Sequence, residues 1–426
     1  MAQENRRKVY VVGVGMTKFE KPFSKKWDYP DMAREAGKEA LSDAGLQYSD
    51  IQSAVVSYCY GEPTSGQRAI YELGLTGVPV YNVNNNCSSG SSALMLARRL
   101  IQSGVEDCVM ALGFEKMEQG LSEKYTDKTS PVKRHFDHMT ALGAEPGIIK
   151  ENMNNMTSDV IKLFVYAGRE YLKKYPHAKY EDFVEVAYKN RKQGLNNPKA
   201  SLQRLPDRDT ISKKGMLSFP VTFWMSAPTA DGSAAAIVCS EEFVRKHGLE
   251  GNAVEIIAQN MVTDLPSSFD KSFMDLSGFN MAKLAADKCY KEANILPSDI
   301  DVAEVHDCFS LNELFMYEAL QFCGEGRGCD LIRQSAWKKN KNGGEVCWMG
   351  KRVVNPSGGL ESKGHPIGAT GSLAQCYELV NQLRGKSGKR QVDEAKTALQ
   401  HNFGIGGAAV VTIYRQFQPN YPQARM

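Results

Sequence analysis

The chain has 426 residues, of which 42% are hydrophobic and 24% are charged, with 37 glycines and 17 prolines. This globular composition excludes a disordered, collagen-like or coiled-coil chain, and a chain of this length is expected to form two or more domains. The 52 basic and 49 acidic residues leave a net charge of +3, which is too balanced to indicate nucleic acid or a membrane surface as the main partner.

The first predicted elements belong to a segment that the chain repeats. Residues 32–56 align without a gap on residues 281–305. In both segments, apolar residues at helical spacing are followed by a Gly or Asn turn, a Ser-Asp-Ile cap signal and an apolar run. This order predicts a helix and then a strand. The expected helices span 32–44 and 281–293, and the expected strands span 54–58 and 302–305.

A second pair of helices and strands follows. Small residues lead a helical pattern at 88–101 and again at 369–383, and an apolar strand closes each half at 108–113 and 408–413. Two similar halves of alternating helices and strands predict an α/β fold whose layers pack around a pseudo-twofold axis. We expect an N-terminal half over residues 1–250 and a C-terminal half over residues 251–426.

A different kind of segment is inserted into the N-terminal half, at about residues 115–235. From 115 to 225 it is polar, shows no strand alternation and predicts helices over 158–174 and 180–192. Residues 169–214 carry 12 Lys and Arg against 6 Asp and Glu. This basic run is either a solvated helical face or a lid that attracts an anionic ligand such as a nucleotide phosphate.

The first motif that could perform chemistry surrounds Cys87. The segment 84–91 is Asn-Asn-Asn-Cys-Ser-Ser-Gly-Ser and leads directly into the second predicted helix. A cysteine at a helix N-terminus lies beside unpaired N–H groups and the positive end of the helix dipole, which favours the thiolate. We therefore expect Cys87 to be a nucleophile rather than a buried structural cysteine.

Three further motifs combine reactive side chains with turn residues. His306 and Cys308, in His-Asp-Cys-Phe, follow a predicted strand and can point to the same side of the chain. His365 lies between Gly and Pro before a helix, where the backbone is restricted. His401, Asn402, Gly404 and Gly406 belong to a Gly-rich turn, whose N–H groups could form an oxyanion hole, although His401 could simply hold the turn by hydrogen bonds.

The ends of the chain and its cysteines bear on location. No apolar segment follows the charged residues 1–8, and none approaches the roughly 20 apolar residues of a spanning helix. We expect a soluble protein without integral membrane contact. Ten cysteines without a C-x-x-C pair favour a reducing compartment over a disulfide scaffold or a zinc ribbon, so no metal is expected. Ala424-Arg425-Met426 matches the C-terminal peroxisomal address, with cytoplasm or mitochondrion as alternatives.

In this order, the motifs N-x-x-C-x-S-G, H-D-C-F, G-H-P-x-G-x-T-G and H-N-x-G-I-G-G resemble the thiolase superfamily. The H-D-C-F and H-N-x-G forms, together with segments 13–19 and 264–269, are similar to thiolases of the sterol carrier protein type. The resemblance covers about residues 8–415. It implies a five-layered αβαβα fold, a helical loop domain over coenzyme A (CoA), a homodimer and thiolysis of 3-ketoacyl-CoA, with CoA as substrate and no other cofactor.

The resemblance also implies a role for each motif. Cys87 would attack the 3-keto carbon, and His365 would raise its nucleophilicity. His365 would also help to bind the thioester oxygen of the departing enolate, and His306, where most thiolases have Asn, would hold the water that completes this oxyanion hole. Cys308 would protonate that enolate and deprotonate the incoming CoA thiol. The N–H of Cys87 and one N–H of the loop 403–407 would stabilise the oxyanion on the 3-keto oxygen.

Two departures and two rival functions remain open at this stage. The segment 330–352 is longer than the connection usual in the family, and could reshape the acyl pocket, the dimer contact or neither. The chain stops at 426, so the lipid-binding domain that follows some of these thiolases is not expected. A condensing enzyme of the acetyltransferase or ketoacyl synthase type shares the fold, although a decarboxylative synthase needs no second cysteine like Cys308. A non-catalytic acyl-CoA or lipid-binding protein is the other rival.

Overall fold

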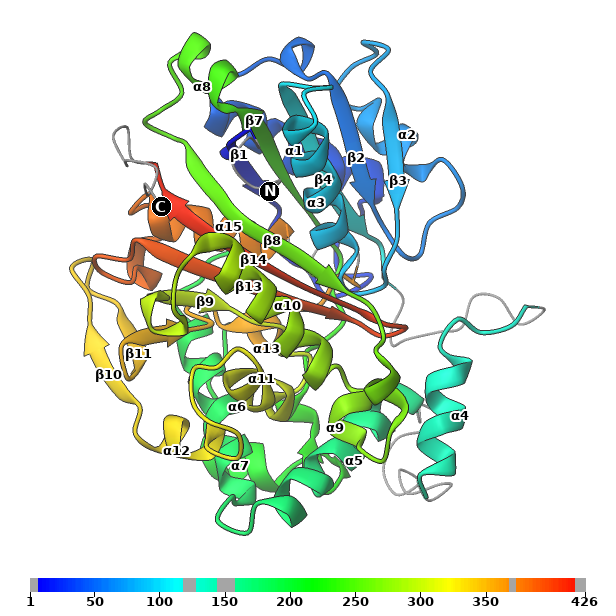
Figure 1. Ribbon diagram of the computed structural model, residues 1–426, viewed down its shortest axis with the longest axis vertical. Coiled ribbons are helices and arrows are strands. Elements are labelled where there is room, and N and C mark those ends of the chain that lie inside the picture. Colours follow the sequence, from blue (N-terminus) through cyan, green and yellow to red (C-terminus); the bar gives the residue numbers. More distant parts are fainter. Residues whose placement is uncertain (1–6, 118–127, 144–157, 368–372, 418–426) are drawn as a thin grey trace.

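A computed structural model describes residues 7–117, 128–143, 158–367 and 373–417 (Figure 1). Its main feature is a 12-stranded sheet. In spatial order the strands are β10 (Ala336–Lys339), β11 (Glu345–Met349), β12 (Arg352–Val354), β9 (Val302–Glu304), β13 (Thr397–Gly404), β14 (Ala408–Gln416), β8 (Val254–Val262), β1 (Val9–Met16), β7 (Gly232–Ser240), β4 (Cys108–Glu115), β2 (Ser53–Ser57) and β3 (Val80–Val83).

The sheet repeats one five-strand arrangement. The order β3-β2-β4-β7-β1 in one part corresponds to β12-β9-β13-β14-β8 in the other. In each part the first three strands pair in parallel and the last two pairings are antiparallel. Within the sheet, the two parts are joined by the pairing of β1 with β8, where Tyr10 and Val11 lie opposite Glu255 and Val254. The duplication in the sequence is therefore a duplication of strand order.

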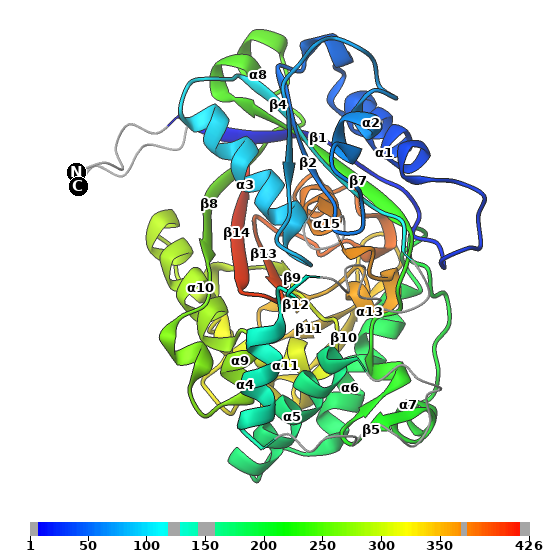
Figure 2. The same cartoon turned by 90° about the vertical axis from the view of Figure 1, so that its right-hand side faces the viewer.

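Helices form three layers around the two parts of the sheet. The central layer holds α3 (Ser89–Gln102) and α15 (Leu373–Leu383), and α15 packs against strands of both parts. One outer layer is formed by α1 (Tyr29–Ala44) and α2 (Ser65–Ile70), and the other by α10 (Phe279–Ala293) and α11 (Ser310–Ala319) (Figure 2). The expected five-layered αβαβα fold is confirmed, because each sheet face buries apolar side chains that a helix layer must cover.

The inserted segment packs as helices beneath the C-terminal part of the sheet (Figure 2). Its helices are α4 (Lys133–Ala141), α5 (Asp159–Lys174), α6 (Tyr180–Gly194) and α7 (Arg208–Lys213). The remaining helices are α8 (Glu241–His247), α9 (Phe273–Leu276), α12 (Gly328–Arg333) and α13 (Gly359–Lys363). Within the described part of the chain, no helix is both long and apolar enough to cross a membrane.

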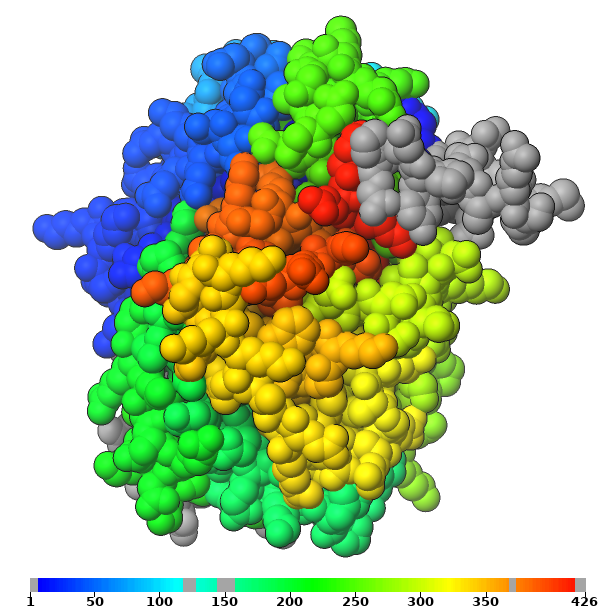
Figure 3. Space-filling view, turned by 90° about the vertical axis from the view of Figure 1, so that its left-hand side faces the viewer, coloured from blue at the N-terminus to red at the C-terminus, as the bar shows by residue number. Residues whose placement is uncertain are grey.

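Three expectations from the sequence need correction. The strand at 408–413 is not the counterpart of 108–113, because β14 occupies the position of β7 and β13 that of β4. The insert is not free of strands, since β5 (Met216–Ser218) and β6 (Val221–Thr222) pair as a short hairpin. The segment 330–352 adds the hairpin β10–β11 to one edge of the sheet, on the face shown in yellow in Figure 3, and it packs on α6.

Candidate active site

Cys87 lies in the loop between β3 and α3, and this loop is held by its own polar side chains. The hydroxyl of Ser89 accepts the N–H of Asn85 at 2.9 Å, and the side-chain amide of Asn85 donates to the hydroxyl of Ser92 at 2.8 Å. Asn86 adopts a left-handed backbone with φ of 51°. Because Ser89 and Ser92 belong to α3, the helix fixes the loop that precedes it and therefore the position of Cys87.

The Gly-rich turn after β13 packs directly against the Cys87 loop. A Cβ atom on Gly404 would lie 2.1 Å from the carbonyl oxygen of Asn85, so only glycine allows this approach. The side-chain amide of Asn86 donates to the carbonyl of Ile405 at 3.0 Å. The backbone N–H groups of Cys87 and Ile405 both hydrogen-bond to the Cys87 sulfur. Gly406, with φ of 101°, follows Ile405 in this turn.

Three loops bring Cys87, His306 and His365 together. The Cys87 sulfur and one ring nitrogen of each histidine lie within 4.8 Å of one another. The two imidazoles meet edge to face, with ring centroids 5.4 Å apart. Cys87 precedes α3 of the N-terminal half, whereas His306 follows β9 and His365 follows α13, both in the C-terminal half. The duplicated fold thus places helix starts and strand ends from both halves around one point.

Cys308 lies close enough to Cys87 for the two thiols to affect each other, whereas the Asp307 carboxylate bonds to α13. The charge of Cys87 is among the influences that raise the pKa of the Cys308 thiol, after burial, which is the largest. The Asp307 carboxylate instead accepts the N–H of Leu360 at 2.7 Å and that of Glu361 at 3.3 Å, at the start of α13. The extended chain therefore directs His306 and Cys308 to one side and uses Asp307 to attach their loop to α13.

Burial changes the ionisation that the sequence suggested for Cys87. It raises the pKa of the Cys87 thiol to about 12, and the two N–H groups at the sulfur only partly oppose this effect. Met117 and Ile367 form the apolar surroundings of the sulfur. The expectation of a thiolate stabilised by the helix N-terminus is therefore wrong for the unliganded site, because desolvation outweighs the helix N-terminus.

The two histidines are neutral. Burial lowers the pKa of His365 to about 4 and that of His306 well below its usual value, where the charges of His365 and His401 add to the effect. A neutral imidazole beside a neutral thiol can accept its proton when the sulfur attacks an electrophile. The thiol and the imidazole, which could act as nucleophile and base, are therefore both uncharged before a substrate binds.

Asn402 sets the orientation and the tautomer of His306. Its side-chain nitrogen lies 3.1 Å from Nδ1 of His306. Since an amide NH2 group only donates, Nδ1 is the acceptor and the neutral ring carries its proton on Nε2. His401 is buried nearby, and neither of its ring nitrogens has a hydrogen-bond partner among the described residues. His401 therefore does not hold the turn by hydrogen bonds from its ring, and burial lowers its pKa to about 3.

A segment that the sequence interpretation missed lines the site on another side. The N–H of Ala227 donates to the carbonyl of Cys308 at 2.9 Å, and the N–H of His365 donates to the carbonyl of Pro228 at 2.8 Å. Thr229 forms a further β-bridge with His365. Residues 226–229 thus connect the loops of Cys308 and His365, and the only signal for them was a proline among small residues before the strand β7.

The basic run 169–214 is exposed over much of its length, as a solvated face would be, with 7 of its 12 cations exposed. Many of its cations are bound within the protein: Lys189 to Glu313 at 2.5 Å, Lys192 to Glu345 at 3.2 Å and Lys199 to Glu39 at 2.8 Å. Lys189 and Arg191 are fully buried. The run therefore combines a solvated face with a buried part that makes internal contacts.

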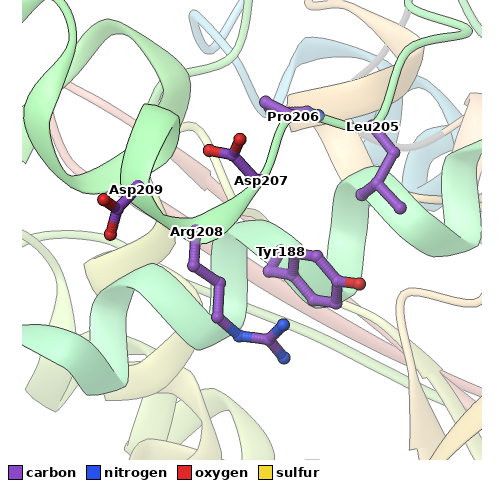
Figure 4. Close-up of a pocket in the computed structure, with 6 residues that line it drawn as sticks. All are labelled: Tyr188, Leu205, Pro206, Asp207, Arg208 and Asp209. Carbon is purple, nitrogen blue, oxygen red and sulfur yellow. The ribbon is translucent and has the colours of Figure 1, made fainter.

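A surface hollow of about 630 Å³ lies between α6 and α7 (Figure 4). Its lining residues are Tyr188, Leu205, Pro206, Asp207, Arg208 and Asp209. The Arg208 guanidinium lies over the Tyr188 ring, 3.7 Å from its centroid, and bonds to the carboxylate of Glu185. Because its cation is already paired and two aspartates line it, the hollow is not built to take an anion, and none of its residues belongs to the loops around Cys87.

Among the described residues, two groups could share a metal ion. They are Cys87, His306 and His365 at the site, and His177 of the insert with Cys329 and Asp330 of α12. If Cys87 acts as a nucleophile, the first group does not hold a metal ion, because a bound ion would occupy the sulfur.

Comparisons with known proteins agree on one family. A model described as the thiolase N-terminal domain matches residues 9–206, and one described as thiolase C-terminal domain-like matches residues 268–416. A Rattus norvegicus protein named sterol carrier protein 2 is 52% identical over 421 residues, which cover 98% of this chain and 73% of that protein. A Caenorhabditis elegans protein named non-specific lipid-transfer protein-like 2 is 44% identical, with 98% of both chains covered. Human mitochondrial 3-ketoacyl-CoA thiolase in complex with CoA has a similar fold, with a TM-score of 0.68 at 18% identity over 97% of this chain and 98% of that one.

Proposed function

The chain belongs to the thiolase family, and we propose that it is a 3-ketoacyl-CoA thiolase, which uses CoA to cleave 3-ketoacyl-CoA into acetyl-CoA or propionyl-CoA and a shortened acyl-CoA. The observation that carries the proposal is the convergence of the Cys87 thiol and two neutral imidazoles on one point, with the Cys308 thiol near enough for Cys87 to affect its pKa. Thiolysis needs these four groups, and CoA enters as a substrate rather than as a resident cofactor.

In the first half of the reaction, the Cys87 sulfur attacks the 3-keto carbon and its proton passes to His365. The oxyanion that forms on the 3-keto oxygen accepts hydrogen bonds from the N–H groups of Cys87 and Ile405, which already point to the sulfur. The carbon–carbon bond then breaks, which leaves an acyl group on Cys87 and an enolate of the departing CoA ester. The Nε2–H of His306 stabilises the enolate oxygen, because Asn402 keeps Nδ1 as an acceptor.

In the second half, Cys308 moves the protons. Its thiol protonates the enolate carbon, and the resulting thiolate takes the proton of the incoming CoA thiol, which then attacks the acyl group on Cys87. The bond between the acyl group and the Cys87 sulfur breaks, the shortened acyl-CoA leaves, and the Cys87 thiolate takes back the proton held by His365. A thiol suits this exchange because its intrinsic pKa is close to that of the CoA thiol. Burial raises the pKa of Cys308, so its resting form is the protonated acid that the first proton transfer needs.

The test of this function is turnover. Purified protein given 3-ketoacyl-CoA substrates of graded chain length and CoA should release acetyl-CoA and the shortened acyl-CoA, and a digest after acetoacetyl-CoA alone should show an acyl adduct on Cys87. The names of the relatives suggest a lipid carrier as the second candidate. Tight binding of acyl-CoA without turnover or adduct would support the carrier and contradict the thiolase. Malonyl thioester decarboxylation would support a condensing enzyme.

We propose that CoA reaches the site along residues 223–229. This segment begins at the surface with Phe223, which is 50% exposed, and ends beside Cys308 and His365. Arg204 lies over the ring of Trp224, with 5.7 Å between the guanidinium carbon and the centroid, and it forms no ion pair with any described residue. Its exposed cation is therefore available to a phosphate.

Arg204→Glu should raise the KM for CoA by about tenfold, the effect of losing about 1.4 kcal/mol of binding, and leave kcat nearly unchanged. Steady-state kinetics with varied CoA checks this. Arg208→Glu is the matched control, because Arg208 is already paired with Glu185. An equal effect of both changes would mean that the general charge of the insert, and not Arg204, attracts CoA.

We also propose a homodimer formed through β3. The sheet has two edges, β3 and β10. Lysines at 338 and 339 protect β10 from pairing with a strand of another molecule. In contrast, β3 carries no charge, and Tyr81 on it is 41% exposed. An uncharged edge strand pairs readily with a second copy. Sedimentation should therefore give twice the chain mass of 47.2 kDa, and Tyr81→Lys should shift it to the monomer. A wild-type monomer at micromolar concentration would contradict this.

A role in peroxisomal fatty-acid β-oxidation completes the proposal. It rests on Ala424-Arg425-Met426, which lies outside the described residues, and on the cleavage direction of the reaction. A fluorescent protein fused to the N-terminus should enter peroxisomes, and the same fusion without the last three residues should not. Cytoplasmic or mitochondrial fluorescence of the intact fusion would support the alternatives named above.

A further inference from the structure

Three consecutive residues in α6 are buried although two of them carry a charge. Lys189, Asn190 and Arg191 are 2%, 0% and 1% exposed. Lys and Arg are almost never fully buried unless they are paired. Successive residues of a helix point in directions about 100° apart, so this part of α6 is enclosed on several sides. The insert is thus joined to the body of the protein here by polar groups.

Arg191 bonds to two segments of backbone. One terminal nitrogen donates to the carbonyl of Trp224 at 3.0 Å and to that of Ser226 at 3.2 Å, and the other donates to the carbonyl of Glu361. The planar guanidinium spreads its N–H groups over a fork, which lets one side chain hold both segments at a fixed separation. A lysine ammonium keeps the charge but has no such fork.

The two segments that Arg191 holds are those that position the reacting groups. Beyond Ser226, the N–H of Ala227 bonds to the carbonyl of Cys308 at 2.9 Å, and the carbonyl of Pro228 accepts the N–H of His365 at 2.8 Å. On the other side, Glu361 lies in α13, which immediately precedes His365. Arg191 is thus one hydrogen bond removed from the backbone of both loops.

The neighbours of Arg191 support the same arrangement. The Asp307 carboxylate accepts the N–H groups of Leu360 and Glu361 and, at 3.1 Å, the side-chain amide of Asn190. The hydroxyl of Ser310 donates to the Glu361 carboxylate at 2.6 Å. Asp307 and Glu361 supply the negative charge that a buried guanidinium requires. All these contacts tie the loop of His306 and Cys308 to the loop of His365.

We propose that Arg191 is a positioning residue of the thiolysis reaction, which sets the separation of the Cys308 thiol and the His365 imidazole by holding residues 224–226 and Glu361 together. The inference rests on the proposed thiolase function. Arg191 touches neither substrate nor the reacting atoms, so it acts on the rate through the distance between the acid that protonates the enolate and the base that activates Cys87.

The test is Arg191→Lys, assayed per active site. Folded protein is first isolated by gel filtration, alkylation of its Cys87 by iodoacetamide is followed by mass spectrometry to count the reactive sites, and kcat for thiolysis is divided by that count. A misplacement of about 1 Å costs on the order of 100-fold in rate, so kcat per site should fall by about that factor. Arg208→Lys, the same change on a paired arginine of the insert, should leave kcat per site unchanged.

A purely structural role would reduce the number of alkylated sites but not kcat per site, and that result would overturn the proposal. If Arg191→Lys does not fold, Ala227→Pro decides, since it keeps Arg191 and removes the N–H that bonds to Cys308. It should lower kcat per site, and an unchanged kcat per site would overturn the proposal. Wild-type protein without turnover would instead refute the thiolase function, so the two failures are distinguishable.

Discussion

Replacing Cys87 with alanine should abolish turnover of 3-ketoacyl-CoA and the acyl adduct together. In the proposed reaction the sulfur is the atom to which the acyl group is transferred. Loss of a covalent nucleophile typically costs about a millionfold in kcat, which places the variant at the detection limit. The measurement is the initial rate of acetyl-CoA release, combined with mass spectrometry of the peptide that contains residue 87.

Cys323→Ala is the matched control for this variant, because Cys323 is also a free, partly buried cysteine but lies between α11 and α12. It should retain both turnover and the adduct on Cys87. If Cys87→Ala kept measurable turnover, or if the wild-type adduct appeared on another cysteine, the assignment of the nucleophile would be wrong. If Cys87→Ala also lost the ability to bind acyl-CoA, its effect would be structural rather than chemical.

The Cys87 thiol and the His365 imidazole are both uncharged in the resting site, and this determines how Cys87 becomes reactive. A thiol with a pKa of about 12 beside an imidazole with a pKa of about 4 does not form an ion pair without help. The help comes from the substrate, because attack on the 3-keto carbon moves the negative charge from sulfur to an oxygen that two N–H groups hold.

The sequence contained enough to predict the fold because the fold is duplicated. The alignment of residues 32–56 with 281–305 predicted α1, β2, α10 and β9 within a few residues. It failed at the later strands: β14 resembles β4 in composition but takes the place of β7 in the sheet. Apolar periodicity marks a buried strand and carries no information about its neighbours, so strand order came only from the structure.

The site was predictable wherever its chemistry is carried by side chains in a short motif. Cys87, His306, Cys308 and His365 have such motifs, and Asn402 lies beside a predicted histidine. Residues 226–229 were not found because they act through backbone N–H and C=O groups, which every residue possesses. Arg191 lies in a basic run, and the sequence alone does not distinguish a buried cation from a solvated one.

Cys308 is the residue whose loss separates the two halves of the proposed reaction. Without its thiol, the enolate that leaves after carbon–carbon cleavage has no proton donor, and the CoA thiol has no base. General acid–base groups contribute about 100-fold to 10,000-fold each, and Cys308 acts twice. Alkylation of Cys87 by iodoacetamide needs neither proton transfer, since it depends on the sulfur and His365 alone.

Cys308→Ala should therefore reduce thiolysis by at least about a thousandfold while Cys87 is still alkylated at close to the wild-type rate. Cys308→Ser is the informative companion, because a hydroxyl preserves the size of the side chain but has too high a pKa to exchange protons with a thiol, and it should be almost as inactive. Equal loss of turnover and alkylation in both variants would mean that Cys308 supports the site sterically. Substantial turnover in Cys308→Ala would move the proton transfers to another group, and His306, whose ring also faces Cys87, would be the next to test.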